Sequence, residues 1–213
     1  MRTLLLILAV MLSIAACTTE VKTSVTAFHT LPAAPKGKTF VMVPYENQEG
    51  SLEWATYANL VSQHLQKYGL VPTQAIKGAD LAVFMVYAID GGKTSVSAVP
   101  VFGQTGGGTT STTTGYVGSR PVYASTYTPP TYGVTGYAPV ERTVFGRALK
   151  ITILDAEQSL ASKKPVVVYE ATATSAGSSG NLNVVMPAIV NGVFKDWPGP
   201  SGTTREQVVP MKE

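Results

Sequence analysis

Apolar and polar residues alternate in several parts of the chain, which is the pattern of a strand with one buried face. The segments that show this pattern, or a short β-rich run, are 21–28, 40–44, 149–153 and 167–173. Leu81–Ile89 differs, because its nine residues are all apolar and stand between Asp80 and Asp90. Such a run predicts a strand buried on both faces, so we expect it at the centre of a sheet.

Two further segments carry apolar residues at helical spacing. The first is expected to begin at Ser51 and to end at Gly69, with its apolar positions at Trp54, Tyr57, Ala58, Val61, Leu65 and Tyr68. The second carries Leu182, Val185, Met186, Ile189 and Val193. Pro187 falls inside that pattern, so the helix either starts late, with the proline in its first turn, or is kinked there.

The order of these elements predicts an α+β fold, a single domain with a mixed, mostly antiparallel sheet and two helices. The domain comprises residues 21–90 and 141–210, with a turn expected at 159–165 between two of its strands. Whether the tail after Trp197 adds an edge strand stays open.

An insert of unusual composition, residues 91–140, interrupts the domain. It holds 10 of the 20 glycines and 5 of the 10 tyrosines, and its only charged residues are Lys93 and Arg120. Such a segment buries too little surface to form a core, so we expect a mobile loop or a long, poorly packed hairpin. Its tyrosines are aromatic rings spaced among small residues, and such rings can stack on sugars, pair with other aromatic rings or self-associate. They are candidate partner-binding residues: Tyr116, Tyr123, Tyr127, Tyr132 and Tyr137. The alternative is a neutral expansion tolerated at a hairpin tip.

The N-terminus has the layout of a secretory signal, with Arg2, an apolar run and small residues over 1–16. The apolar run is too short to span a bilayer. Cys17, the one cysteine, directly follows Ile14-Ala15-Ala16, which resembles a bacterial lipobox. Cys17 would then be the lipidation site and 17–20 a tether, and Thr18 after it favours the outer membrane. The alternative is a secreted protein with an incidental thiol.

Composition excludes several kinds of chemistry. A net charge of +3 provides no dense cationic surface, so nucleic acid is not expected as a partner. A single cysteine excludes an internal disulfide and any zinc site that needs two thiolates. No cofactor and no metal is implied.

Few residues are candidates for catalysis. His29 and His64 have no neighbour that would make a metal pair or a triad, so both are interpreted as structural. Gly106-Gly107-Gly108 lacks the lysine of a phosphate loop. Asp80, Asp90 and Asp155 stand at strand ends, where aspartate usually caps a turn. Arg147 would pair internally or mark a bulge at Gly146, and Trp54 and Trp197 are expected in the core, with Trp197 alternatively on the rim of a groove that binds a partner.

A set of short motifs, in this order, resembles a known family of bacterial lipoproteins. The motifs are Lys38-Thr39-Phe40, Tyr68-Gly69-Leu70, Ala79-Asp80-Leu81, Tyr169-Glu170-Ala171, Met186-Pro187-Ala188-Ile189, Phe194-Lys195-Asp196-Trp197-Pro198-Gly199 and Gly202-Thr203-Thr204-Arg205. Together they resemble the family known as domain of unknown function 4136, with Trp197 where a phenylalanine is more usual. The resemblance implies an envelope lipoprotein with an α/β sandwich and no assigned activity. The long insert departs from the family pattern.

Three functions follow as hypotheses. The first is a non-enzymatic binding or accessory module, anchored through Cys17 to the outer membrane and facing the periplasm, with an envelope protein or a glycan as partner. The second is a structural or adhesive role of the insert. The third, a hydrolase that uses paired carboxylates, has the least support.

Overall fold

The computed structural model describes residues 20–31 and 35–210. The predicted signal sequence and Cys17 lie outside the described residues. The chain divides into two compact units, one formed by residues up to Gly92 and from Val144 onward, and the other by Lys93–Thr143.

The first unit contains a sheet, three α-helices and a short 3-10 helix. Its elements in chain order are β1 (Glu20–His29), β2 (Thr39–Met42), η1 (Glu46–Gln48), α2 (Leu52–Lys67), β3 (Val71–Pro72), β4 (Leu81–Ile89), the C-terminal part of β8 (Thr131–Asp155), α3 (Ala156–Ser162), β9 (Val167–Gly177), α4 (Leu182–Phe194) and β10 (Thr203–Pro210).

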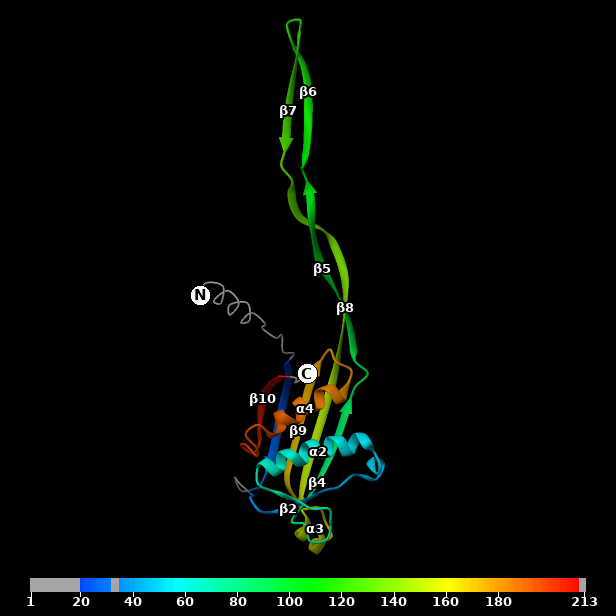
Figure 1. Cartoon of the computed structure of the whole chain (residues 1–213), viewed down its shortest axis with the longest axis vertical. Coiled ribbons are helices and arrows are strands. Elements are labelled where there is room, and N and C mark those ends of the chain that lie inside the picture. Colours follow the sequence, from blue (N-terminus) through cyan, green and yellow to red (C-terminus); the bar gives the residue numbers. More distant parts are fainter. Residues whose placement is uncertain (1–19, 32–34, 211–213) are drawn as a thin grey trace, which may run out of the picture. The chain divides into compact units, whose positions relative to one another are not determined.

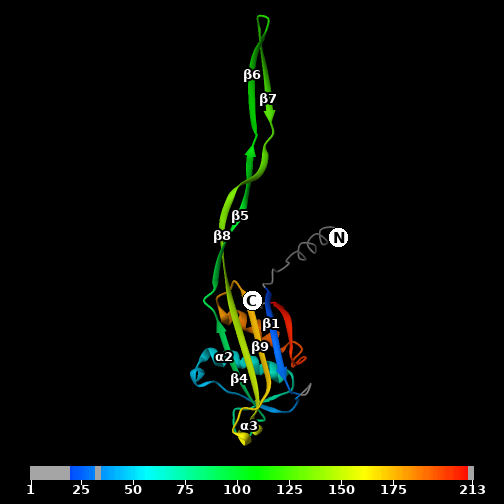
Figure 2. The same ribbon diagram turned by 180° about the vertical axis from the view of Figure 1, so that it is seen from behind.

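The strands lie in the order β10-β1-β9-β8-β4-β2-β3. β2 pairs in parallel with β3 and β4, whereas the pairs β1–β10, β1–β9, β8–β9 and β4–β8 are antiparallel. α2 and α4 lie against one face of the sheet (Figure 1), and the opposite face is turned to the viewer in Figure 2. The α+β class with a mixed, mostly antiparallel sheet is therefore confirmed.

The alternating strands bury the expected positions. On β1 the residues Val21, Thr23, Val25 and Ala27 are at most 4% exposed, and the register places them in line with the buried residues of β9 and β10. This shared face packs on α2 and α4 and forms the main core.

The first helix begins and ends where the sequence predicts. Ser51 is its N-cap and its side chain accepts a hydrogen bond from the backbone N–H of Trp54. Tyr57, Ala58, Val61 and Leu65 are buried. The chain leaves the helix at Gly69, where φ is +89°.

The second predicted helix, α4, starts at Leu182, and the side chain of Asn181 caps it. Pro187 is the sixth residue of α4, so the late start with proline in the first turn was wrong. The helix is buried almost all round, and its Gly192 lies against Thr23 and Gln207 of the sheet.

Three details of the sheet differ from the prediction. β8 and not β4 occupies the centre, and β4 is covered on both faces only at its start, because Val86 on its second half is 46% exposed. A third helix, α3 (Ala156–Ser162), occupies the first half of the segment 159–165 that was expected to be a turn. Asp155 caps this helix, and its Ala156 packs beside Ala82 on the outer face of the sheet. The alternation breaks at Val167, which is exposed because the β8–β9 register shifts at Ile153 and Leu154.

The tail after Trp197 forms the edge strand β10, which pairs antiparallel with β1 from Glu20↔Pro210 to Ala27↔Thr203. The sequence left this question open, because an eight-residue polar and apolar mixture suits either a strand or a free tail.

A row of polar side chains crosses the face of the sheet that packs on the helices. Arg147, Ser175, Thr23 and Gln207 are paired in register across β8, β9, β1 and β10, and they are the buried polar residues of the described chain. The Ser175 hydroxyl donates to the Lys22 carbonyl (2.8 Å), and an Arg147 Nη2 donates to the Ser179 carbonyl (2.6 Å). No partner is found among the described residues for Thr23 Oγ1 or Arg147 Nε.

The second unit is a long hairpin and not a loop without secondary structure. Its strands are β5 (Lys93–Gly106), β6 (Thr109–Val117), β7 (Arg120–Thr128) and the N-terminal part of β8. β5 pairs with β8, and β6 pairs with β7 in a separate two-stranded sheet. The two ladders meet at Gly107-Gly108 and Pro129-Pro130, where a side chain at Gly107 would collide with the Pro129 carbonyl oxygen.

Candidate functional site

Three tyrosines of the hairpin share one face of the β6–β7 ladder. The register pairs Tyr116 with Pro121, Thr114 with Tyr123 and Thr110 with Tyr127. Residues that are directly opposite each other in an antiparallel pair point to the same face, and residues two apart on one strand do so too. Tyr116, Tyr123 and Tyr127 therefore form one group, which we call the tyrosine face.

The spacing of these rings follows from strand geometry. Tyr123 and Tyr127 are four residues apart, or about 14 Å along the strand. Tyr116 lies across the ladder, about 7 Å from Tyr123 along the strand direction and about 5 Å to the side. The rings thus form a line that an extended ligand could follow.

The tyrosine face is exposed and uncharged. Tyr116 is 77% exposed, Tyr123 73% and Tyr127 62%. The other residues on this face are Thr110, Thr112, Thr114, Ser125 and Pro121. Hydroxyl groups can donate and accept hydrogen bonds beside an aromatic ring, so this face suits a ligand with many hydroxyls and no net charge.

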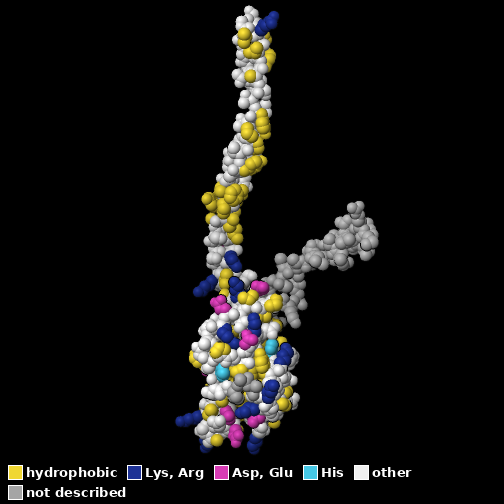
Figure 3. All heavy atoms as spheres, turned by 90° about the vertical axis from the view of Figure 1, so that its left-hand side faces the viewer, with side chains coloured by type: hydrophobic (Ala, Val, Ile, Leu, Met, Phe, Trp, Pro, Cys, Tyr) yellow, Lys and Arg dark blue, Asp and Glu magenta, His cyan; other side chains and the backbone are white. Residues whose placement is uncertain are grey.

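The remaining two predicted tyrosines, Tyr132 and Tyr137, are on β8 and are 73% and 70% exposed. Their positions differ in parity, so a regular strand directs them to opposite faces. The hairpin as a whole carries 13 of the 23 exposed large hydrophobic side chains of the described chain. Figure 3 shows these side chains along the hairpin in yellow.

Trp197, the sixth candidate, is a core residue and not part of a groove rim. It is 4% exposed, and its ring lies 5.1 Å from Tyr68 and 5.6 Å from Tyr169 between ring centroids. The Tyr68 hydroxyl accepts from the backbone N–H of Trp197. A partner cannot reach this indole while the domain is folded.

The three aspartates at strand ends hold backbone groups. Asp80 Oδ2 accepts from the backbone N–H and the hydroxyl of Thr39, both at 2.7 Å, and these bonds hold the pKa of Asp80 below its usual value. Asp90 accepts from the backbone of Gly92 and Gly146. Asp155 caps α3 through the backbone N–H of Gln158. Carboxylates held in this way stabilise turns and helix ends.

Both histidines pack against neighbouring elements. The His29 ring bonds the Gly199 carbonyl through Nε2 at 2.7 Å. His64 stacks on Phe194, with ring centroids 5.1 Å apart, and burial, followed by the charge of Lys67, lowers its pKa. Within the described residues, no three His, Cys, Asp or Glu side chains are placed to hold a metal ion.

Arg147 bonds within the protein, through its hydrogen bond to the Ser179 carbonyl, which agrees with one of the two alternatives predicted for it. It is 4% exposed, and burial lowers its pKa while the nearby charge of Asp90 acts in the opposite direction. Its side chain fills the space beside Gly177, where an added Cβ would lie 3.2 Å from the guanidinium.

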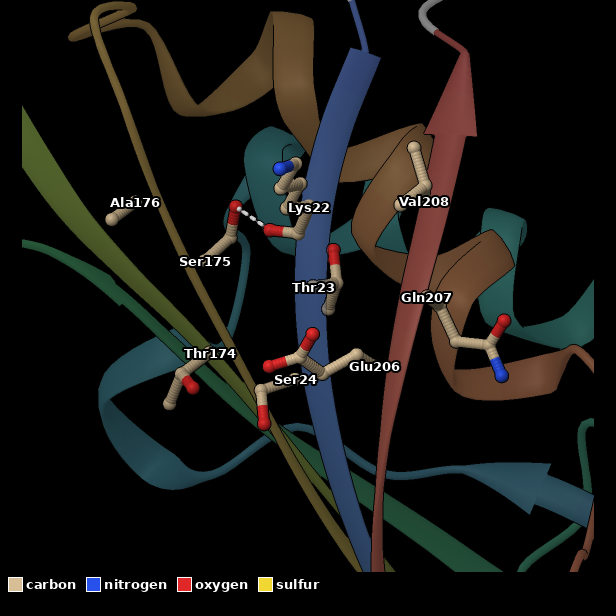
Figure 4. Close-up of a pocket in the computed structure, with 9 residues that line it drawn as sticks. All are labelled: Lys22, Thr23, Ser24, Thr174, Ser175, Ala176, Glu206, Gln207 and Val208. Carbon is tan, nitrogen blue, oxygen red and sulfur yellow. Dashed lines mark hydrogen bonds between the residues drawn. The ribbon is translucent and has the colours of Figure 1, made fainter.

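A shallow hollow of about 480 Å³ lies on β9, β1 and β10. Figure 4 shows the residues that line it, among them Lys22 and Ser24 of β1, Thr174 of β9 and Glu206 of β10. The sequence does not reveal this hollow, because its three strands are far apart in the chain and none of its residues is unusual alone.

No helix in the described part of the chain has the length and apolar character needed to cross a bilayer.

Comparison with known proteins gives the family. No curated protein matches the chain. Among solved structures, it is similar to a PDZ domain protein from Parabacteroides distasonis, with 16% identity over 95% of this chain and a TM-score of 0.42. It spans 42% of that protein's length. It is also similar to the PelC dodecamer from Paraburkholderia phytofirmans, with 15% identity, coverage of 82% of this chain and 96% of the other, and a TM-score of 0.38.

Likenesses of this size say nothing about function. The family model described as "Domain of unknown function (DUF4136)" matches residues 24–199, a span that runs from β1 through the hairpin to the turn after Trp197. The chain therefore belongs to the DUF4136 family, as its motifs indicated.

Proposed function

We propose that this protein is a lipid-anchored, non-enzymatic module of the bacterial cell envelope that binds an uncharged glycan through the tyrosine face of its hairpin. The observation that carries the proposal is the grouping of Tyr116, Tyr123 and Tyr127 on one exposed face, among hydroxyl side chains and without a charge. Exposed aromatic rings offer apolar surface to the faces of sugar rings, and neighbouring hydroxyls offer hydrogen bonds.

The anchor is supported by the sequence. Cys17 follows a signal-like segment that is too short to span a bilayer. A lipidated N-terminal cysteine with two or more acyl chains would give stable membrane attachment. We place the protein at the outer membrane, facing the periplasm, because Thr18 follows the cysteine.

A non-enzymatic role is supported by the hydrogen bonds of the carboxylates that were considered for catalysis. Asp80, Asp90 and Asp155, the carboxylates that could have formed a catalytic pair, each hold backbone groups. Asp80 and Asp90 also stand at opposite ends of the nine-residue strand β4, about 30 Å apart.

The glycan proposal is tested with an array of neutral, acidic and amino oligosaccharides. The full chain carrying Cys17→Ser is compared with the same chain in which Tyr116, Tyr123 and Tyr127 are replaced by serine. The matched control replaces Val117 and Val122, which lie on the opposite face of the same ladder, by serine.

We expect neutral oligosaccharides to bind, and the triple tyrosine variant to bind them at least about 10-fold more weakly, since each aromatic contact contributes about 0.5–1.5 kcal/mol. The control should bind like the parent. Failure of every neutral glycan to bind, or equal losses in the tyrosine and valine variants, would refute the role of this face.

The anchor has its own test. Palmitate labelling and membrane fractionation should place the intact chain in the outer membrane and the Cys17→Ser chain in the soluble fraction. A Cys17→Ser chain that stays in the membrane would show that something other than this thiol holds it.

A further inference from the structure

The outer edge of β6 is an unprotected strand edge. β6 pairs with β7 alone in a two-stranded sheet, so its other edge presents a row of backbone N–H and C=O groups to solvent. Its nine residues, Thr109–Val117, include no proline and no charged side chain, and the first six are all threonine or serine. Threonine favours strands, and a neutral β-forming segment without proline is the kind that adds a further strand.

The other free strand edges of the described residues carry proline, charge or both. In the hairpin, β5 contains Lys93 and Pro100, and the part of β8 that pairs with it contains Pro139, Glu141 and Arg142. β7 begins with Arg120-Pro121, and a charge and a proline both discourage pairing at an edge. β10 carries Arg205 and Glu206 and ends in Pro210. β3 at the opposite edge of the large sheet has two residues, of which one is proline. The contrast singles out β6.

We infer that two copies of this chain pair through their β6 strands, antiparallel and about a two-fold axis, to form the sheet β7-β6-β6-β7. A two-stranded ribbon is marginally stable alone in water, and independent stability needs three or more strands with a hydrophobic face. The pairing brings the ribbon to four strands and uses the free backbone groups over about 30 Å of edge.

A second copy fits this edge because the edge is neutral. Arg120 is the one charged residue in the β6–β7 ladder, and an antiparallel two-fold pairing places the two copies of it at opposite ends of the new sheet. Threonine then lies opposite threonine across the interface, a pair that can form hydrogen bonds between side chains. The β7 edges left outside are the protected ones, so the assembly closes at two copies.

The same symmetry sets where the tyrosines lie. A two-fold axis that relates antiparallel neighbours is perpendicular to the sheet, so it keeps each face on the same side. The tyrosine faces of the two copies then join into one surface with six rings. The inference stands on the strand edge and does not depend on what this surface binds.

The test uses the full chain with Cys17→Ser, so that lipid plays no part, and measures its mass by sedimentation velocity over a range of concentrations. One variant carries Thr110→Lys, Thr112→Lys and Thr114→Lys, and a second carries glutamate at the same positions. These side chains are exposed, and far-UV circular dichroism checks that each variant is folded. The matched control places lysine at Thr172, Thr174 and Thr204, exposed positions on the large sheet.

We expect the parent and the control to form dimers. The lysine and the glutamate variants should each be monomers, with a dissociation constant raised at least about 100-fold, and their 1:1 mixture should form a dimer again because the opposite charges then face each other. A parent that stays monomeric up to about 100 µM, a concentration well above the Kd of a typical specific interface, would overturn the inference. So would a lysine variant that still dimerises, or a parent that forms open polymers.

Discussion

Replacing Trp197 by alanine measures whether this indole is a core anchor or a binding residue. Its side chain is 4% exposed and contacts the rings of Tyr68, Tyr169 and Phe194. A buried tryptophan removes up to about 250 Å² from water, and at about 25 cal/mol per Å² this gives an upper limit of about 6 kcal/mol. Measured core truncations of this size cost about 3–5 kcal/mol, which is the loss that we expect for Trp197→Ala.

Trp197→Phe separates packing from hydrogen bonding. Nε1 of Trp197 makes no hydrogen bond within 3.5 Å among the described residues, so phenylalanine loses ring volume and only the weaker polar interaction with the Tyr169 hydroxyl. We expect a cost of about 1–2 kcal/mol. Urea unfolding followed by far-UV circular dichroism gives the free energies, and Tyr123→Ala on the exposed hairpin is the control, expected within about 0.5 kcal/mol of the parent. If Trp197→Ala costs less than about 1 kcal/mol, the indole is not buried in solution and the reasoning fails.

Three further outcomes are expected. Replacing residues 93–143 by an Asn-Gly turn should leave a domain that unfolds cooperatively, because the Asp90 N–H already donates to the Gly146 carbonyl at 2.9 Å; loss of the cooperative transition in urea would contradict this. Stability should fall as the pH drops below 6.5, the usual pKa of histidine, because the pKa of His64 is lowered in the folded state, which therefore binds the proton less readily than the unfolded state. His64→Gln should flatten this part of the plot of stability against pH. An unchanged slope would argue against this role of His64. Gly107→Ala should weaken hydrogen-exchange protection near Pro129, because the added Cβ would collide with the Pro129 carbonyl oxygen. Gly136→Ala, where no atom lies within 4 Å of the added Cβ, should have no such effect. Equal effects of the two substitutions would refute the contact between Gly107 and Pro129.

Local patterns in the sequence were enough to locate most elements of the α+β domain. The parity of Val21, Val25 and Ala27 predicted the buried face of β1, and Ser51 and Gly69 marked the ends of α2, because each signal lies within the segment that it describes. α3 was missed, since its seven residues are too few to show a helical period. The position of β4 was wrong, because strand order depends on contacts between distant segments.

The candidate site was predicted in part. The tyrosines were identified by their density in an uncharged segment, but a periodicity of four to seven residues does not say which of them share a face. That property depends on the pairing of Thr114 with Tyr123 and of Thr110 with Tyr127, which follows from the turn at 118–119. Trp197 was expected in the core, where it lies, but the groove rim stayed open as the alternative because an aromatic residue beside a proline occurs in both places.

The buried polar row across the large sheet has a consequence for how the sheet finds its pairing. A slip of one residue would turn a strand inside out, but a slip of two residues keeps its faces and brings one small apolar side chain opposite another. On β1 and β9, where the inward residues include Val25, Ala27, Ala171 and Ala173, the apolar contacts alone distinguish such slips poorly. A slip of two would carry Thr23 and Ser175 away from each other. It would set Ser175 against a valine and Thr23 against Ala173 or Gly177, which leaves both hydroxyls without a polar neighbour on the paired strand. The buried polar row therefore destabilises sheets with a shifted register more than it stabilises the native register. We expect that replacing its residues with apolar ones gives a domain that is no less stable but less uniquely folded.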